Sequence, residues 1–237
     1  MTQSAGSAII AGFGPGLGEE TALRLVDEGL RVGMIARSVG PLENVAAKHG
    51  AGLVPVPADV TDAAAVESAA VESAVDHVER TLGPIKCAVF NAGAFLKGSI
   101  LDFAPSEFER AWRVGTYGGF VFGQAIAKRM VAREEGTIIF SGATASLRGN
   151  ATSFGFSGSK FGLRSVAQCM ARELGPRGIH VAHVVIDGVI KGHKHADPGG
   201  DAHMDPKNLA EIYVNLHKQP RSTWTHELDV RPWCEKF

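Results

Sequence analysis

Short apolar runs and amphipathic stretches alternate along this chain. The run at 7–11 has the length and composition of a buried strand, and apolar positions spaced by three and four residues across 16–28 predict a helix after it. Further strands are predicted at 32–36, 53–57, 87–90, 137–140, 180–186 and 224–230. Further helices are predicted at 41–49, from Thr61 and Asp62 to about 82, from 105 to about 133, at 153–174 and at 206–217. This alternation predicts an α/β fold, in which a doubly wound, parallel, seven-stranded sheet is the middle layer of a three-layer αβα sandwich.

The predicted elements leave no room for a linker, so we expect one domain across residues 1–237. The longest connection, at about 188–205, is rich in glycine, histidine and aspartate and is long enough to form a lid over a site. The alternation at 224–228 is typical of an edge strand. The tail at 231–237 carries two aromatic residues, and packing on its own chain or against a neighbouring subunit are both open.

Composition excludes several classes of function. The net charge is −1 and the 24 basic and 25 acidic residues are interspersed, so no nucleic-acid surface is indicated. The chain has neither the apolar stretch of a membrane span, roughly 18 residues or more, nor the basic start of a signal peptide. Cys87, Cys169 and Cys234 are odd in number and widely spaced, which favours free thiols in a cytoplasmic protein and indicates no metal site.

Candidate chemistry begins at the turn between the first strand and the first helix. This turn contains Gly12, Gly14, Pro15, Gly16, Leu17 and Gly18. Gly12 permits a tight turn, Gly16 leaves space for a pyrophosphate, and Gly18 lets the helix pack close to the strand. The N–H groups at the start of the helix then face the phosphates. The segment therefore predicts a Rossmann-type dinucleotide site.

The end of the second strand indicates which dinucleotide binds. An acidic side chain there would accept a hydrogen bond from the ribose 2′-hydroxyl of NAD(H). This chain has Arg37 and Ser38, which can instead hold a 2′-phosphate. We therefore expect NADP(H), with NAD(H) as the less favoured alternative.

Taken together, these motifs resemble the short-chain dehydrogenase/reductase family over nearly the whole chain. The matching positions are the glycine spacing, Asp59-Val60, Asn91-Ala92-Gly93, Lys160, and Asp187-Gly188 followed by Val189 and Ile190. The resemblance implies that Asp59 and Val60 contact adenine. It also implies that Lys160 holds the nicotinamide ribose, and that the other matching positions contribute to the cofactor site.

The proton-transfer residues of that family are largely replaced. Phe156 stands where the resemblance expects the tyrosine of a Tyr-x-x-x-Lys motif, and Gly115 where it expects an asparagine. The position of the family serine falls on Ala143, with hydroxyl groups close by. The remaining candidates for catalysis are Lys160, Thr144, Ser141 and Tyr117. Phenylalanine has no ionisable proton, and loss of a positioned general acid costs about 10²–10⁴-fold in rate.

Other proton donors remain open as hypotheses. His180 and His183 lie on one strand at odd spacing, so they face opposite sides of the sheet, and at least one should be buried. His193 and His195 lie on the presumed lid and suit proton transfer near neutral pH. Asp187 is placed to orient the nicotinamide or the substrate. No histidine spacing requires a metal ion, and we predict none.

The sequence predicts an NADP(H)-dependent oxidoreductase with an atypical proton-transfer site. Phe95, Leu96, Phe154 and Phe156 predict an apolar cavity, so we expect a small hydrophobic carbonyl, imine or enone as substrate. Two alternatives remain: a dinucleotide-binding sensor without turnover, and a non-redox lyase or isomerase. We expect a homodimer or homotetramer that associates through the helices at 105–133 and 153–174, and no membrane or nucleic-acid partner.

Overall fold

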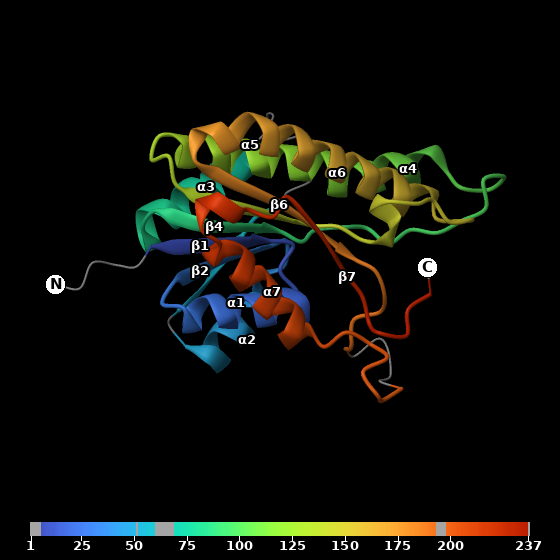
Figure 1. The fold of residues 1–237 in the computed structure, drawn as a ribbon, viewed down its shortest axis with the longest axis horizontal. Coiled ribbons are helices and arrows are strands. Elements are labelled where there is room, and N and C mark those ends of the chain that lie inside the picture. The colour runs from blue at the N-terminus through green and yellow to red at the C-terminus, as the bar shows by residue number, and fades with distance from the viewer. Residues whose placement is uncertain (1–5, 51, 60–68, 193–197, 237) are drawn as a thin grey trace.

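The computed structural model describes residues 6–50, 52–59, 69–192 and 198–236, and Figure 1 shows their arrangement. Its strands are β1 (Ser7–Ala11), β2 (Arg31–Ala36), β3 (Leu53–Pro57), β4 (Ile85–Phe90), β5 (Gly136–Ser141), β6 (Ile179–Ile186) and β7 (Glu227–Val230). Its α-helices are α1 (Leu17–Asp27), α2 (Val39–His49), α3 (Ala69–Leu82), α4 (Pro105–Trp112), α5 (Gly118–Val131), α6 (Phe154–Leu174) and α7 (Pro206–Lys218). The predicted start of the third helix, at Thr61 and Asp62, lies outside the described residues.

The seven strands form one parallel sheet in the order β3-β2-β1-β4-β5-β6-β7. The chain starts in the middle with β1, runs to one edge through β2 and β3, and then returns to build β4 to β7 on the other side. Every described strand pair is parallel. The predicted doubly wound sheet is therefore confirmed, and the order of its strands changes direction between β1 and β4, where such sheets bind ligands.

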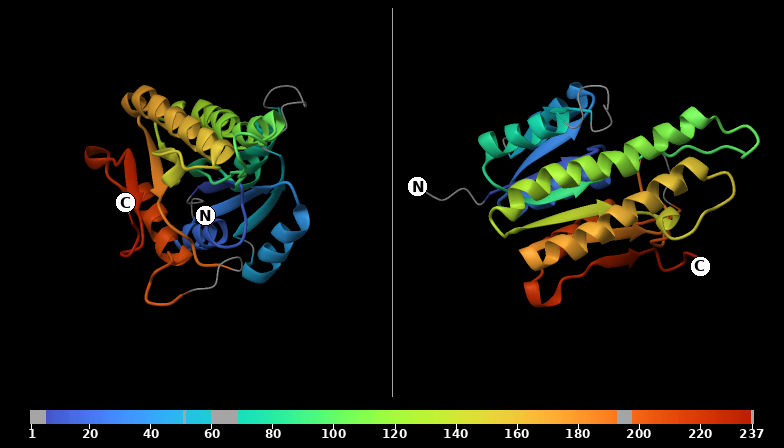
Figure 2. Two further views of the ribbon diagram at one scale, coloured as in Figure 1. Left: turned by 90° about the vertical axis from the view of Figure 1, so that its right-hand side faces the viewer. Right: turned by 90° about the horizontal axis from the view of Figure 1, so that it is seen from above.

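Helices cover both faces of the sheet. In Figure 1, α3, α5 and α6 lie on one side and α1, α2 and α7 on the other, and the right-hand view of Figure 2 looks onto α5 and α6. Two apolar cores result, because alternate residues of each strand point to opposite faces. Phe90, Phe122 and Phe140 lie in the first core, and Ile10, Met34 and Tyr213 in the second.

The predicted long helix at 105–133 is not one continuous α-helix. A π-helical turn at Arg113–Tyr117 joins α4 to α5. Within this turn, a Cβ added to Gly115 would overlap the hydroxyl of Ser159, and the Thr116 hydroxyl donates a 2.8 Å hydrogen bond to the Ser159 carbonyl. The prediction was wrong here because the turn is stabilised by contact with α6, which lies far away in the sequence.

The last strand is shorter than predicted. A 3-10 turn occupies Arg221–Thr223, and β7 begins only at Glu227, at the edge of the sheet. Trp224 does not pair in the sheet: its ring stacks on His180 at 5.1 Å, and its indole N–H donates to the Gln219 carbonyl. The edge position was predicted correctly, while the strand's start was not, because a tertiary ring contact holds this segment.

His180 and His183 are both buried and face opposite sides of β6, as the odd spacing predicts. His180 stacks on Trp224 in the α7 layer, and His183 donates from Nδ1 to Glu227 at 3.0 Å on the α6 side. Arg164 of α6 also binds Glu227, with two hydrogen bonds of 2.7 Å. This chain of contacts fixes α6 against the edge of the sheet.

The described parts of the loop at 188–205 bond to one another and to the C-terminal tail. Lys191 N donates to the Met204 carbonyl and Met204 N to the Val189 carbonyl, each at 2.8 Å. The indole N–H of Trp233 donates to the Gly200 carbonyl, so the C-terminal tail packs on its own chain at this point. His193 and His195 lie outside the described residues.

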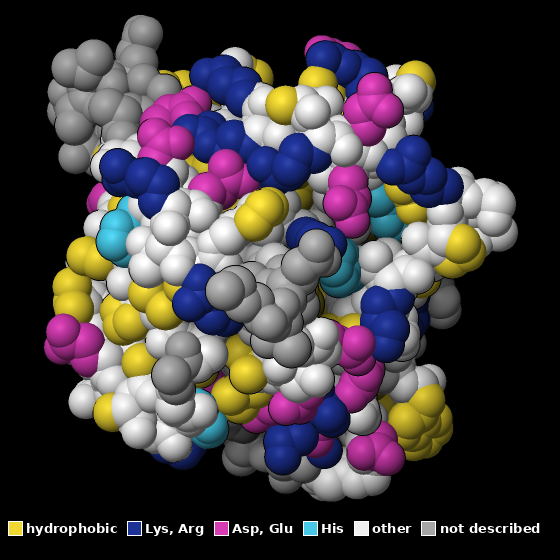
Figure 3. All heavy atoms as spheres, turned by 90° about the vertical axis from the view of Figure 1, so that its left-hand side faces the viewer, with side chains coloured by type: hydrophobic (Ala, Val, Ile, Leu, Met, Phe, Trp, Pro, Cys, Tyr) yellow, Lys and Arg dark blue, Asp and Glu magenta, His cyan; other side chains and the backbone are white. Residues whose placement is uncertain are grey.

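Surface features agree with an ordinary globular protein. Figure 3 shows basic and acidic side chains intermixed on the face at the left of Figure 1. Among the described residues, no helix is both long and apolar enough to cross a membrane. Cys87 is buried, Cys169 and Cys234 are exposed, and all three are free thiols, as predicted.

The turn between α6 and β6 provides a test of the fold. Gly178 has φ +82°, and a Cβ there would overlap the backbone carbonyl of Glu134. We expect Gly178→Ala to lower the free energy of unfolding by about 1–2 kcal/mol or more, since an L-residue is strained in this conformation. Gly175→Ala is the matched control, because Gly175 has φ −54° and no atom within 4 Å of an added Cβ. Urea denaturation of both variants measures the difference. Equal stabilities would contradict the conformation of Gly178 described here.

Candidate functional site

A cleft of about 740 Å³ opens at the carboxyl ends of the strands. Four loops line it: the glycine turn after β1 and the segments that follow β4, β5 and β6. Loops in this position are contributed by neighbouring strands on both sides of the point where the strand order changes direction. The topology therefore brings together residues as far apart in the sequence as Gly14 and Gly192.

The glycine turn forms the entrance to the cleft on the α1 side. Gly16 is the N-cap of α1 and has φ +91°, and no atom lies within 4 Å of a Cβ added to it or to Gly14. Gly14, Pro15, Gly16, Leu17 and Gly18 all line the cleft. The first N–H groups of a helix have no earlier turn to bond to. The space in front of them is open, and helix N-termini of this kind can bind a diphosphate.

The adenosine end of a dinucleotide would lie toward β2. The amides of Gly12 and Phe13 both donate to the carbonyl of Ile35, so the glycine turn lies directly against the end of β2. Arg37 and Ser38 follow immediately; both are exposed, and Ser38 is the N-cap of α2 without a side-chain capping bond. Asp59 is half-buried after β3, and Val60 lies outside the described residues.

Asn91, Ala92 and Gly93 extend β4 toward the cleft. Asn91 N donates to the Ala11 carbonyl at 2.8 Å, and its side-chain amide donates to the Gly12 carbonyl at 3.4 Å. Ala92 is buried against Gly12. Asn91 and Gly93 line the cleft, and Gly93 lies beside the Lys160 side chain, since a Cβ added to it would be in van der Waals contact with Nζ at 3.5 Å.

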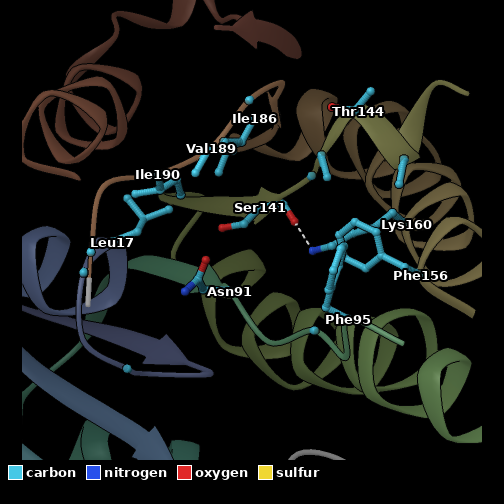
Figure 4. Close-up of a pocket in the computed structure, with 18 of the residues that line it drawn as sticks. Leu17, Asn91, Phe95, Ser141, Thr144, Phe156, Lys160, Ile186, Val189 and Ile190 are labelled. Carbon is cyan, nitrogen blue, oxygen red and sulfur yellow. Dashed lines mark hydrogen bonds between the residues drawn. The ribbon is translucent and has the colours of Figure 1, made fainter. Parts of the chain in front are cut away.

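Lys160 lies at the centre of the cleft, with only 5% of its surface exposed. Its Nζ donates a 2.6 Å hydrogen bond to the backbone carbonyl of Ser141, drawn as a dashed line in Figure 4. Burial lowers the pKa of Lys160 to about 8, because the charged ammonium loses its hydration. Lys160 was predicted as a catalytic and cofactor-binding residue, and it does line the cleft.

Two aromatic rings form the wall beside Lys160. Phe156, one helical turn before Lys160, has its ring centroid 5.9 Å from Nζ. Phe95 meets Phe156 edge to face, with centroids 5.0 Å apart. Figure 4 shows both rings on the side of the cleft opposite Leu17. Both line the cleft as predicted, whereas Leu96 and Phe154 are not among the described lining residues.

Ser141 was predicted to contribute a hydroxyl, and the structure corrects this. Its Oγ shares a buried hydrogen bond of 2.8 Å with the hydroxyl of Tyr213 on α7. The side chain therefore points to the face of the sheet opposite α6, and only its backbone carbonyl reaches Lys160. Tyr213 is committed to the same bond, and burial raises the pKa of its phenol well above the usual value.

Thr144 and Asp187 form a pair beside the cleft. The Thr144 hydroxyl donates to the Asp187 carboxylate, which also lies 3.4 Å from Arg231 and 3.9 Å from Arg148. Thr144 lines the cleft, but its proton is held by Asp187. The Asp187 carboxylate is bound by these side chains rather than directed at the cleft, while Gly188, Val189 and Ile190 do line the cleft as predicted.

Tyr117 does not reach the cleft in the described structure. It belongs to the π-helical turn and packs its ring against Trp112, with centroids 5.9 Å apart. The prediction that it supplies a proton is corrected by this packing. The expectation rested only on its closeness in sequence to Gly115, which does not determine the direction in which the ring points.

Some lining residues were missed by the sequence analysis. Besides the glycines and alanines of the loop after β5, the polar side chains Lys97, Asn150, Ser153 and Lys191 line the cleft. They lie on loops, where no periodicity marks them. Their common signal is position, since each follows the carboxyl end of a strand on the same edge of the sheet. Among the described residues, no group of three or more His, Cys, Asp or Glu side chains is placed to hold a metal ion.

Comparison with known proteins defines the class. Residues 7–195 match the family described as short chain dehydrogenase, so the chain belongs to this family. The family match and its oxidoreductase relatives support an NAD(P)-dependent oxidoreductase.

Three similar proteins illustrate the likeness. An uncharacterized oxidoreductase of Staphylococcus aureus is 26% identical over 229 residues, which cover 95% of this chain and 96% of the relative. A Xanthobacter autotrophicus protein named inactive 2-(S)-hydroxypropyl-CoM dehydrogenase 2 is 32% identical over 199 residues, covering 82% and 84%. The crystal structure of a short-chain dehydrogenase from Rhodopseudomonas palustris has 34% identity and a TM-score of 0.83, covering 96% and 98%.

The lowered pKa of Lys160 predicts how stability depends on pH. Lys160 has a pKa of about 8 when folded and 10.5 ordinarily, so the unfolded chain binds more protons between these values. Its contribution to the free energy of unfolding therefore rises with pH across that window, by on the order of 3 kcal/mol. Wild type should gain stability relative to Lys160→Met between pH 7 and about 10, measured by urea denaturation. The exposed Lys207→Met serves as control, and parallel pH profiles for wild type and Lys160→Met would refute the prediction.

Proposed function

We propose that this protein is an NADP(H)-dependent reductase of small, apolar, conjugated carbonyl compounds. The observation that carries the proposal is the Phe156 ring beside Lys160, in the place where the family resemblance expects a phenol. When bound, the reduced dinucleotide supplies a hydride. The residues of the chain decide which acceptor can use that hydride without a phenolic proton donor.

NADP(H) is favoured over NAD(H) by the end of β2. Arg37 and Ser38 stand exposed beside the glycine turn and can bind a 2′-phosphate. The open helix N-terminus at Gly14 and Gly16 is suited to the diphosphate. Lys160 and Asn91 line the far part of the cleft, where a nicotinamide riboside would fit.

Simple ketones are poor acceptors in this cleft. Their reduction leaves a strongly basic alkoxide that needs a proton at once. The Ser141 hydroxyl is turned toward Tyr213, the Thr144 proton is held by Asp187, and Phe156 has none to give. A conjugated enone accepts hydride at its β-carbon and becomes an enolate, which is a weaker base because its charge is spread over oxygen and carbon.

Charge distinguishes an enone from an iminium substrate. The charged side chains that line the described cleft are Lys97, Lys160 and Lys191, all of them cationic. An iminium cation would be repelled by this set, while the enolate oxygen would be stabilised by the Lys160 ammonium. Solvent then delivers the proton to the α-carbon. We therefore place the neutral enone ahead of the imine.

The apolar wall fits such a substrate. Phe95 and Phe156 present edge-to-face rings next to Lys160, and Ile186, Val189 and Ile190 line the other side. A substrate held between these surfaces would be shielded from water except at the open end.

We also expect self-association, because Phe108, Trp112, Phe120 and Phe161 are partly exposed on α4, α5 and α6.

A second function, dinucleotide binding without turnover, has one observation in its favour. The Ser141 and Thr144 hydroxyls are already engaged, and a relative 32% identical to this chain is named as inactive. This alternative needs the same cofactor site but no acceptor. Measurement of turnover separates the two functions.

Arg37 provides the test of cofactor choice. We expect Arg37→Ala to weaken NADPH binding by roughly 10- to 100-fold, the loss of one or two charge-assisted hydrogen bonds. NADH binding should change little, since NADH has no 2′-phosphate. Titration calorimetry of both coenzymes measures the two affinities, with Arg177→Ala, an exposed arginine at the opposite end of the sheet, as the control. Equal losses for NADPH and NADH would rule out a role in 2′-phosphate recognition.

The acceptor preference tests the reaction. With NADPH, the wild type should reduce benzylideneacetone at the conjugated double bond and leave acetophenone unchanged. Phe156→Tyr combined with Ala143→Ser should raise acetophenone reduction by about 10²-fold or more, because a phenol near Lys160 restores a general acid. Consumption of NADPH and analysis of products by chromatography measure both reactions.

The remaining outcomes have clear meanings. NADPH binding without reduction of any enone would favour the non-turnover function. A product formed without consumption of NADPH would indicate a lyase or isomerase. Reduction of acetophenone by the wild type at the rate of the double variant would contradict the proposed role of Phe156.

A further inference from the structure

We propose that the open end of the cleft binds an anionic group of the substrate through Lys97, so that the substrate is an apolar enone bearing a carboxylate. This inference rests on the proposed function, because it names the class of molecule that the same cleft takes. It concerns a side chain outside the cofactor and proton-transfer positions discussed above.

Lys97 is an exposed side chain beside the aromatic wall. It lies on the loop after β4, and its Nζ lies 4.9 Å from the centroid of the Phe95 ring. The next residue, Gly98, donates a 2.8 Å hydrogen bond to the carbonyl of Thr152. The loop that carries Lys97 is thereby joined to the loop before α6, which contributes Asn150 and Ser153 to the cleft.

The charges of the cleft leave Lys97 available for a ligand. Lys160 donates to the Ser141 carbonyl, and Lys191 lies 3.8 Å from Asp201 and 4.0 Å from Asp205. In the parts of the chain that the structure describes, no carboxylate forms an ion pair with Lys97, and no acidic side chain lines the cleft. A cation beside an apolar wall attracts an anion that enters from solvent.

The dinucleotide does not account for Lys97. Its phosphates belong at the glycine turn around Leu17, and Figure 4 places Phe95 and Phe156 on the opposite side of the cleft. Lys97 follows Phe95 by two residues and contacts its ring, so it lies on the substrate side. An anion held there would be a group of the substrate.

The neighbouring polar groups complete the site. Asn150 is exposed and carries an amide that can donate to a carboxylate, and the Ser153 hydroxyl is nearly buried at the same end of the cleft. Behind them, the Phe95 and Phe156 rings offer an apolar surface. The arrangement matches a molecule with an aromatic or aliphatic body and a carboxylate at the end of the enone that faces Lys97.

Binding of a non-reducible pair of ligands tests the inference. Full-length protein saturated with NADP⁺ is titrated by calorimetry with 3-benzoylpropionate and with 3-benzoylpropionamide, which differ in charge but hardly in shape. Wild type should bind the carboxylate roughly tenfold more tightly than the amide, as expected for one charge-assisted hydrogen bond. Lys97→Met should bind both equally, and Lys207→Met, at an exposed site on α7, should behave like wild type.

Two results would overturn the inference: equal binding of acid and amide by wild type, or an unchanged preference in Lys97→Met. This measurement requires no turnover, so it stands apart from the proposed function. Turnover is tested separately with trans-3-benzoylacrylate and its methyl ester. If both are reduced, Lys97→Met should raise KM for the acid about tenfold and leave kcat and the ester unchanged. If neither is reduced, the proposed function fails while the binding comparison still decides the role of Lys97.

Discussion

The hydrogen bond from Lys160 to the backbone carbonyl of Ser141 is the interaction on which the cleft depends. It joins α6 to the end of β5 at 2.6 Å and holds an ammonium where only 5% of the side chain is exposed. Removing this charge from water is costly, which is why its pKa falls to about 8. The rest of α6 is fixed accordingly, through Ser159 against the π turn and Arg164 against Glu227.

What the buried Lys160 ammonium can do depends on whether the side chain at position 156 is a phenol or, as here, a phenylalanine. Beside a phenol, the ammonium would stabilise a phenolate and support proton transfer to a ketone oxygen. Beside a phenylalanine ring it stabilises negative charge on the substrate and, with a pKa of about 8, can itself give up a proton. The proposed conjugated acceptor makes the smallest demand on this one cation, because it delocalises the charge that a hydride leaves, and the cationic lining of the cleft attracts the same kind of molecule.

Much of the fold and the position of the candidate cofactor site could be predicted because local patterns determine them. The strands at 7–11 and 53–57 and the glycine turn follow from apolar runs and from backbone geometry at Gly16. The orientation of Ser141 could not be predicted, because both faces of β5 are buried and its sequence therefore does not show which residues face α6. The π turn and Lys97 also escaped prediction, since one depends on a distant helix and the other lies on a loop without periodicity.

Gly115 and Lys160 are linked in space through Ser159. A Cβ added at position 115 would overlap the Ser159 hydroxyl, which lies next to Lys160 in α6 and is buried with it. A side chain at 115 therefore requires the Ser159 hydroxyl to change its rotamer, or the π turn to move away from α6. An alanine at 159 would relieve this overlap, so the packing at Ser159 couples the choice of residue at 115 to the helix that carries Lys160.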